Sequence, residues 1–185
     1  MIIYYTDKYA GGREESHRLL GEAIAVHTGD KAQAEKLTAA LKKGENGKPY
    51  IEGFSCFSIS HTGNIWAVLV ADRECGLDVQ YEKNCNIRSI SERFFNPLDA
   101  AGIADSDDFF RIWARREALA KAIGGTVYDT DMPPASCENA SINGKQYTIS
   151  DIIIPGMPEL YAAVCLEGGP EETGAEFRVL QTEES

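Results

Sequence analysis

Apolar residues along the chain fall into runs of two kinds, which predict different elements. Short continuous or alternating runs predict β-strands at 1–5, 54–60, 65–71, 76–80, 145–155 and 160–167. Longer segments with apolar residues three or four positions apart predict helices at 13–27, 31–43, 89–95 and 109–125. Gly29 and Gly44 are expected to end the first two helices, and an Asn-Pro break and an acidic loop separate the last two.

The predicted elements occur twice in the same order. Each set has a strand, a helix and a hairpin, and the helices share a pattern, RLLGEAIAVHTG in one and REALAKAIGG in the other. We therefore expect an α+β fold of two similar α/β halves, residues 1–75 and 76–185, with a ligand in the cleft between them. The acidic, Gly-rich segment from about residue 167 is expected to be a solvated tail, in which Val179 and Leu180 can dock as a short strand.

Composition narrows the class of protein. The 185 residues, 43% hydrophobic and 25% charged, suit one globular unit, and compactness in two halves suggests a monomer. No apolar run has the length of a membrane span and the N-terminus lacks a signal-peptide pattern, so a cytoplasmic protein is expected. A net charge of −11 disfavours nucleic-acid binding, although local cations can still hold an anionic ligand. The five cysteines lack a CxxC pair, and most are expected to be buried or half-buried thiols.

Two segments carry the strongest candidate chemistry. In GLDVQ, Asp78 and Gln80 share one face of the strand, which indicates either a wet face or a pair of oxygen ligands for a cation such as Mg²⁺. In WARREALAKAIGG, Trp113, Glu117 and Lys121 stand at intervals of four, which indicates either a surface ion pair or one side of a cleft. For each segment alone the structural interpretation is favoured.

Other candidate residues are less specific when each is taken alone. His61, in SISHTGN, is a turn histidine that caps the backbone or, with the neighbouring N–H groups, an anion-binding residue. Lys48, in a GKP turn, and the arginines Arg18 and Arg116 carry no specific signal by themselves.

Taken in order, four segments resemble the motifs of the 4′-phosphopantetheinyl transferases of the Sfp type. These motifs are a GKP turn, FxxSHS/TG, G-I/L-D-I/V-E and W-x-x-K-E-A/S-x-x-K-x-x-G, and they stand here as GKPYI, FSISHTG, GLDVQ and WARREALAKAIG. The resemblance extends through SHRLLGEAI, RFF and LYAAVC, so it covers nearly the whole chain. The internal repeat matches the two halves of that family, which are related by a pseudo-two-fold axis.

The resemblance implies transfer of the phosphopantetheine arm of coenzyme A to a serine of an apo acyl or peptidyl carrier protein. The family uses Mg²⁺ and releases 3′,5′-ADP. Asp78 and Glu117 match its metal ligands, Gln80 occupies the position of the third ligand, and Glu117 also matches the base for the attacking serine. Lys121 matches a residue that contacts phosphate and stabilises the transferred group. The positions expected to contact coenzyme A are Lys48, His61, Ser60, Arg18, Trp113 and Arg116.

Two departures from the motifs leave alternatives open. Gln80 removes one formal charge from the metal site, and Arg116 replaces the lysine that the family has before its glutamate. The first alternative to an active transferase is a catalytically weak relative that binds coenzyme A or a carrier protein without turnover. The second is an unrelated α/β acid–base enzyme that relies on Glu117 and His61.

Overall fold

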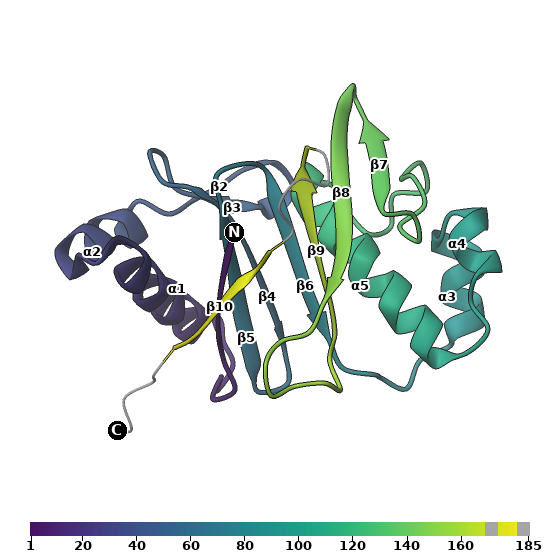
Figure 1. Cartoon of the computed structure of the whole chain (residues 1–185), viewed down its shortest axis with the longest axis horizontal. Coiled ribbons are helices and arrows are strands. Elements are labelled where there is room, and N and C mark those ends of the chain that lie inside the picture. Colours follow the sequence, from purple (N-terminus) through teal and green to yellow (C-terminus); the bar gives the residue numbers. More distant parts are fainter. Residues whose placement is uncertain (169–173, 181–185) are drawn as a thin grey trace.

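A computed structural model describes residues 1–168 and 174–180 and shows a mixed α+β protein built on two four-stranded sheets (Figure 1). The first sheet has the order β10-β1-β5-β4, and the second has the order β6-β9-β8-β7. The strands of the first sheet are β1 (Ile2–Thr6), β4 (Cys56–Thr62), β5 (Ile65–Ala71) and β10 (Glu176–Val179). Those of the second are β6 (Cys75–Gln80), β7 (Asn139–Ile142), β8 (Lys145–Ile152) and β9 (Tyr161–Glu167).

Two helices cover the outer face of the first sheet. The apolar side of α1 (Arg13–Thr28) packs on alternate residues of β1 and β5, and α2 (Lys31–Ala39) packs beside α1. Gly29 adopts a left-handed conformation with φ 70°, which confirms the predicted end of the first helix. The predicted end of the second helix at Lys43 is wrong. Lys42–Lys43 form the short strand β2, which pairs with β3 (Pro49–Tyr50) and takes these residues out of the helix.

The long helix α5 (Ser106–Ile123) covers the outer face of the second sheet and ends at Gly124, which has φ 66°. The helix predicted at 89–95 is α3 (Ile87–Phe94). Besides the short strands β2 and β3 and the 3-10 turn Glu45–Gly47, two elements were not predicted, namely β7 and α4 (Pro97–Ala101). The predicted Asn-Pro break is present, since α3 ends at Phe94 before it. The same pair also begins α4, because the Asn96 side chain accepts from Leu98 N and Pro97 takes the first helical position.

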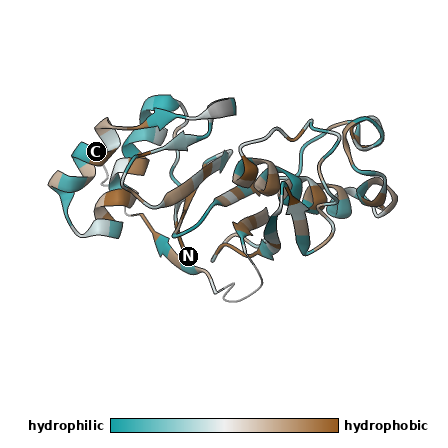
Figure 2. Ribbon diagram, turned by 90° about the horizontal axis from the view of Figure 1, so that it is seen from above, coloured by the Kyte–Doolittle hydropathy of each residue, from teal (hydrophilic) through white to brown (hydrophobic). Residues whose placement is uncertain are grey.

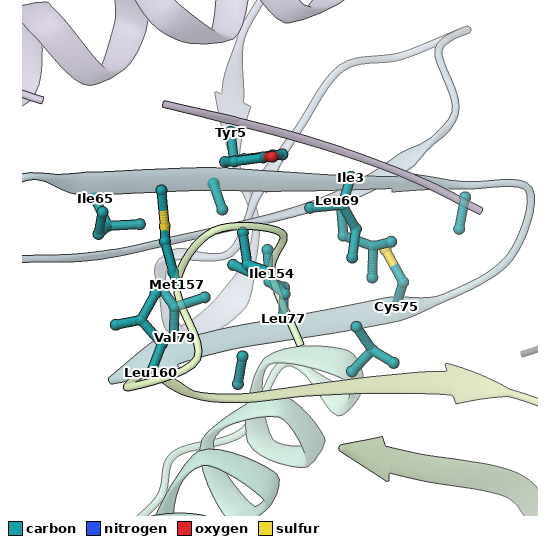
Figure 3. Packing of buried hydrophobic residues seen from close by; sticks show 14 residues of the cluster. Ile3, Tyr5, Ile65, Leu69, Cys75, Leu77, Val79, Ile154, Met157 and Leu160 are labelled. Atoms are coloured by element: carbon teal, nitrogen blue, oxygen red, sulfur yellow. The ribbon is translucent and has the colours of Figure 1, made fainter. Parts of the chain in front are cut away.

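The central core lies between the two sheets and is lined by alternate residues of their strands (Figure 3). Ile3, Ile65 and Leu69 of the first sheet meet Leu77 and Val79 of the second. The loop that joins β8 to β9 enters this core with three apolar side chains, those of Ile154, Met157 and Leu160. Along the helices the ribbon changes between hydrophobic and polar residues from turn to turn, as expected for helices with one buried side (Figure 2).

The two sheets meet along β4 and β6, where side-chain hydroxyls replace the usual backbone ladder. Three hydroxyls on alternate residues of β4 accept hydrogen bonds from backbone N–H groups 19 residues further along the chain. The pairs are Ser58 with Leu77 (3.0 Å), Ser60 with Val79 (3.2 Å) and Thr62 with Tyr81 (3.4 Å). We call this row the hydroxyl seam, and it fixes the register of one sheet against the other.

The strand order gives partial support to the predicted repeat. The first sheet contains β1-β5-β4 and the second β6-β9-β8, so in each the single strand pairs with the later strand of the hairpin. An axis relating the halves and the boundary near residue 75 stay predictions. The docked strand expected near Val179 is confirmed, because β10 pairs parallel to β1 and Leu180 is buried. That segment therefore lies in the sheet of the other half. The rest of the predicted acidic tail falls largely outside the described residues.

No helix within residues 1–168 and 174–180 combines the length and apolar character that crossing a membrane requires.

Candidate active site at the junction of the two sheets

Asp78 lies at the centre of a polar cluster between β6, β4 and α5. Because side chains alternate along β6, Leu77 and Val79 face the core and Asp78 faces α5, as predicted. The Asp78 side chain is buried, and its Oδ1 accepts from Ser60 Oγ at 2.8 Å and from Lys121 Nζ at 2.7 Å. Residues from two sheets and a helix thus converge on one carboxylate oxygen.

Lys121 is held by three acceptors, which use all the donors of its ammonium group. Besides Asp78 Oδ1, Lys121 Nζ donates to Ser60 Oγ and to the Leu77 carbonyl, both at 3.1 Å. The ion pair of Lys121 is therefore made across to β6, with Asp78, and not along the helix with Glu117. This observation favours the cleft interpretation of the α5 motif over a surface ion pair.

Glu117 lies one turn before Lys121 on α5 and is half-buried. Burial raises the pKa of the Glu117 carboxyl, and the nearby charge of Asp78 raises it further, while Lys121 and Lys83 lower it only in part. Two carboxylates thus lie close enough to repel each other in a partly dehydrated site. Such a pair is suited to share a cation or to take up a proton.

The cluster also contains an unused carboxylate oxygen. Asp78 Oδ2 is buried and has no hydrogen-bond partner among the described residues, which is costly for a charged atom. With Glu117 as a second carboxylate, this oxygen fits a hard divalent cation such as Mg²⁺. Gln80 follows Asp78 on the same face of β6, and its amide nitrogen donates to the Tyr81 carbonyl at 3.0 Å. Among residues 1–168 and 174–180, no group of three or more His, Cys, Asp or Glu side chains is arranged to hold a metal.

The raised pKa of Glu117 predicts how stability depends on pH. The folded protein holds the proton of the Glu117 carboxyl more tightly than the unfolded chain does. The contribution of Glu117 to the free energy of unfolding is therefore most favourable at low pH. It is lost as pH rises from the ordinary value of about 4.5 through the folded value. Glu117→Gln is therefore expected to melt above the wild type at pH 8 and to lose this advantage towards pH 4. Thermal melts in buffers without divalent cations measure the difference, and a gap that widens on acidification would contradict it.

Lys48 and His61 lie outside this cluster. Lys48 Nζ donates to Glu74 at 2.7 Å and to the Ala122 carbonyl at 3.0 Å, at the C-terminal end of α5. It lines a pocket of about 690 Å³ between β3, β4 and the turn joining β7 to β8, to which Lys145 also contributes. The exposed His61 ring lies 5.2 Å from that of Tyr9, and no hydrogen bond within the described residues joins His61 to Glu117. The acid–base enzyme alternative therefore gains no geometric support.

Three other predicted coenzyme A contacts are not brought to the cluster either. Arg18 pairs with Glu15 and Glu22 on its own helix. Trp113 is half-buried, and its ring lies 5.9 Å from that of Phe109 and 6.0 Å from that of Phe95. Arg116 is fully buried, and its guanidinium donates to the carbonyls of Val127 and Asp129. In this structure the Arg116 side chain braces the segment after α5 and offers no surface to a phosphate.

Sequence reasoning missed the partners that surround the predicted residues. The Leu77 carbonyl accepts from Lys121, Ser60 contacts both Asp78 and Lys121, and Glu74 is the partner of Lys48. The first two hydroxyls of the seam had a visible signal, because Ser58 and Ser60 alternate with Phe57 and Ile59 on a predicted strand. The Leu77 carbonyl and the Lys48 pair depend on tertiary contacts and had no such signal.

The fold and the cluster define an α+β protein in which two carboxylates and a lysine meet at the junction of two sheets. Residues 74–166, half of the chain, match the family model of the 4′-phosphopantetheinyl transferase superfamily. The chain belongs to this superfamily. The matched residues include β6 and α5 with Asp78, Glu117 and Lys121.

Individual relatives share low sequence identity with the chain, over about half of its length. The chain is 28% identical over 94 residues to the 4′-phosphopantetheinyl transferase gsp of Aneurinibacillus migulanus, a match that covers 48% of this chain and 39% of the relative. It is 32% identical over 107 residues to the 4′-phosphopantetheinyl transferase AcpT of Salmonella typhi, covering 50% of this chain and 56% of the relative. The chain thus spans roughly half or less of the length of the curated relatives it matches.

Proposed function

We propose that this protein transfers the 4′-phosphopantetheine arm of coenzyme A to a serine of an apo acyl or peptidyl carrier protein, with release of 3′,5′-ADP. The observation that carries the proposal is the convergence of Asp78, Glu117 and Lys121 inside the segment that matches the family. The named activity of the two relatives supports the same reaction.

Asp78 and Glu117 would hold the Mg²⁺, which when bound neutralises the pyrophosphate and stabilises the charge that develops on it. The serine hydroxyl attacks the phosphorus that carries the pantetheine arm, and the bond from that phosphorus to the bridging oxygen of the departing 3′,5′-ADP breaks. Glu117 accepts the serine proton directly or through water, and its raised pKa makes it a better base than an ordinary glutamate. Lys121 contacts the phosphate once one of its three present acceptors is given up.

The carrier protein would dock near the Arg93-Phe94-Phe95 segment at the end of α3. Phe95 itself is buried, but the neighbouring surface exposes two large apolar side chains, those of Leu98 (66% exposed) and Tyr128 (57% exposed). An acidic protein with a net charge of −11 repels an acidic partner at long range. Apolar contacts of this kind therefore suit the docking step better than charge attraction does.

The intact mass of a carrier protein tests the proposal. The protein is incubated with an apo carrier protein, coenzyme A and Mg²⁺, and a gain of one phosphopantetheine on serine supports transfer. No gain with coenzyme A still bound supports the weak relative that binds without turnover, an alternative that Gln80 favours. Absence of both gain and binding would overturn the proposal and its alternative.

Gln80 provides a prediction about the metal requirement. A glutamate at this position restores one negative charge beside Asp78 and is expected to strengthen Mg²⁺ binding. Gln80→Glu should therefore reach half-maximal transfer at a lower Mg²⁺ concentration than the wild type does, although the wild type is itself expected to be active with Gln80 in place. Titration of Mg²⁺ in the mass assay measures this difference, and equal requirements in the two proteins would contradict a role for residue 80 at the metal.

A further inference from the structure

The three hydroxyls of the seam are alike in their backbone contacts and differ in one respect. Ser58 and Ser60 are both buried, and each accepts from the N–H of the residue 19 positions along the chain. Only Ser60 also contacts the polar cluster, through Asp78 Oδ1 at 2.8 Å and Lys121 Nζ at 3.1 Å. Ser60 is thus the point at which the seam between the sheets touches the candidate metal site.

The hydrogen-bonding capacity of Ser60 is completely used. A hydroxyl donates one hydrogen bond and accepts two. Lys121 Nζ and Val79 N are donors, so the Ser60 proton goes to Asp78 Oδ1, and the two lone pairs accept from Val79 and Lys121. The orientation of this hydroxyl follows from its neighbours, because only the carboxylate accepts.

This arrangement separates the two oxygens of the Asp78 carboxylate. Oδ1 is taken by Ser60 and Lys121, whereas Oδ2 is buried with no partner among the described residues. Without the Ser60 contact, the carboxylate is free to rotate about its χ2 angle and to turn either oxygen to Lys121. The Val79 N–H donates to Ser60 Oγ and so anchors the Ser60 hydroxyl to β6, the strand that carries Asp78. The hydroxyl and the carboxylate that accepts from it are therefore both held by the backbone of β6.

We propose that Ser60 is a positioning residue, whose hydroxyl fixes the Asp78 carboxylate so that Oδ2 is presented to the divalent cation. This inference rests on the metal site of the proposed function and goes beyond it, since it gives the side chain a role that contact with coenzyme A does not include. It also makes the metal site depend on the junction of the two sheets. Partners that orient a metal ligand in this way change metal affinity by about 10–100-fold when they are removed.

Ser58 supplies a matched control for the experiment. Ser60→Ala and Ser58→Ala each remove one buried hydroxyl and one bond to the backbone of β6, but only Ser60→Ala removes the contact with Asp78. Binding of Mn²⁺ is measured by electron paramagnetic resonance in the absence of coenzyme A, alongside thermal melts. We expect Ser60→Ala to weaken Mn²⁺ binding by about 10–100-fold and Ser58→Ala by less than about 2-fold, at similar losses of stability.

A conservative variant and the wild-type assay complete the design. Ser60→Thr keeps the hydroxyl, in a seam that already holds Thr62, and is expected to bind Mn²⁺ nearly as the wild type does. Equal Mn²⁺ affinities of Ser60→Ala and Ser58→Ala, or no Mn²⁺ binding by the wild type, would overturn the inference. A selective loss in Ser60→Ala with a wild type that transfers no phosphopantetheine would support the positioning role and refute the proposed function.

Discussion

Replacement of Asp78 by asparagine is expected to reduce phosphopantetheine transfer by about 10³-fold or more. The variant keeps the size of the side chain and an oxygen that can accept from Ser60 and Lys121, so the hydrogen bonds to Oδ1 can persist. What it loses is one of the two carboxylate charges, those of Asp78 and Glu117, that we assign to the divalent cation, beside the uncharged Gln80. Electrostatic stabilisation of this kind contributes several kcal/mol, and each 1.4 kcal/mol corresponds to about a factor of ten in rate. The intact-mass assay under single-turnover conditions measures the loss.

A matched aspartate separates this effect from general damage. Asp151 on β8 also accepts from a cation of α5, since Arg115 Nη1 lies 3.1 Å from its Oδ2, but it lies outside the polar cluster. Asp151→Asn removes the same charge from the same half and is expected to retain transfer within a few-fold. Glu117→Gln is expected to lose transfer as Asp78→Asn does. Comparable losses in Asp78→Asn and Asp151→Asn would refute the special role of Asp78.

The strands and the long helix could be predicted because their patterns are local. Alternation in GLDVQ placed Asp78 on the opposite face from Leu77 and Val79, and the structure confirms this arrangement. The exact ends of the helices could be predicted less well from the sequence. Lys42 and Lys43 have no apolar signal, and their pairing with Tyr50 and Pro49 depends on the turn between them.

The candidate site could be predicted only in part, for a physical reason. Asp78 and Lys121 are 43 residues apart, and nothing local in either segment shows that their side chains meet. The resemblance to a family placed them in one site, and the structure shows a direct ion pair between them that the resemblance did not predict. The same resemblance did not predict the position of Arg116, because its guanidinium satisfies carbonyls of a segment with no regular structure. Such a contact depends on the length and path of that segment.

Gly76 explains why α5 can approach β6 closely enough to form this site, and its replacement is expected to have the largest effect on stability. A Cβ added at Gly76 would lie 1.9 Å from the Ala118 carbonyl oxygen and 2.6 Å from Ala122 N. Both atoms belong to the backbone of α5, so no side-chain rotation relieves the overlap and the helix must move away from the strand. Overpacking of a core costs about 1–3 kcal/mol when side chains can adjust, and we expect Gly76→Ala to exceed this range. Urea denaturation followed by circular dichroism measures the loss.

The same displacement is expected to impair the site, because β6 carries Asp78 whereas Lys121 and Glu117 stand on the helix that must move. Gly102→Ala provides the control, since this glycine has φ −84° and its added Cβ meets only ordinary contacts, the nearest at 3.5 Å. That variant is expected to stay within about 1 kcal/mol of the wild type and to bind Mn²⁺ normally. Gly76→Ala should lose both stability and Mn²⁺ affinity, in contrast to Ser60→Ala, which should lose affinity out of proportion to stability. A Gly76→Ala protein with the unfolding midpoint of the wild type would show that α5 does not pack on β6 at this distance.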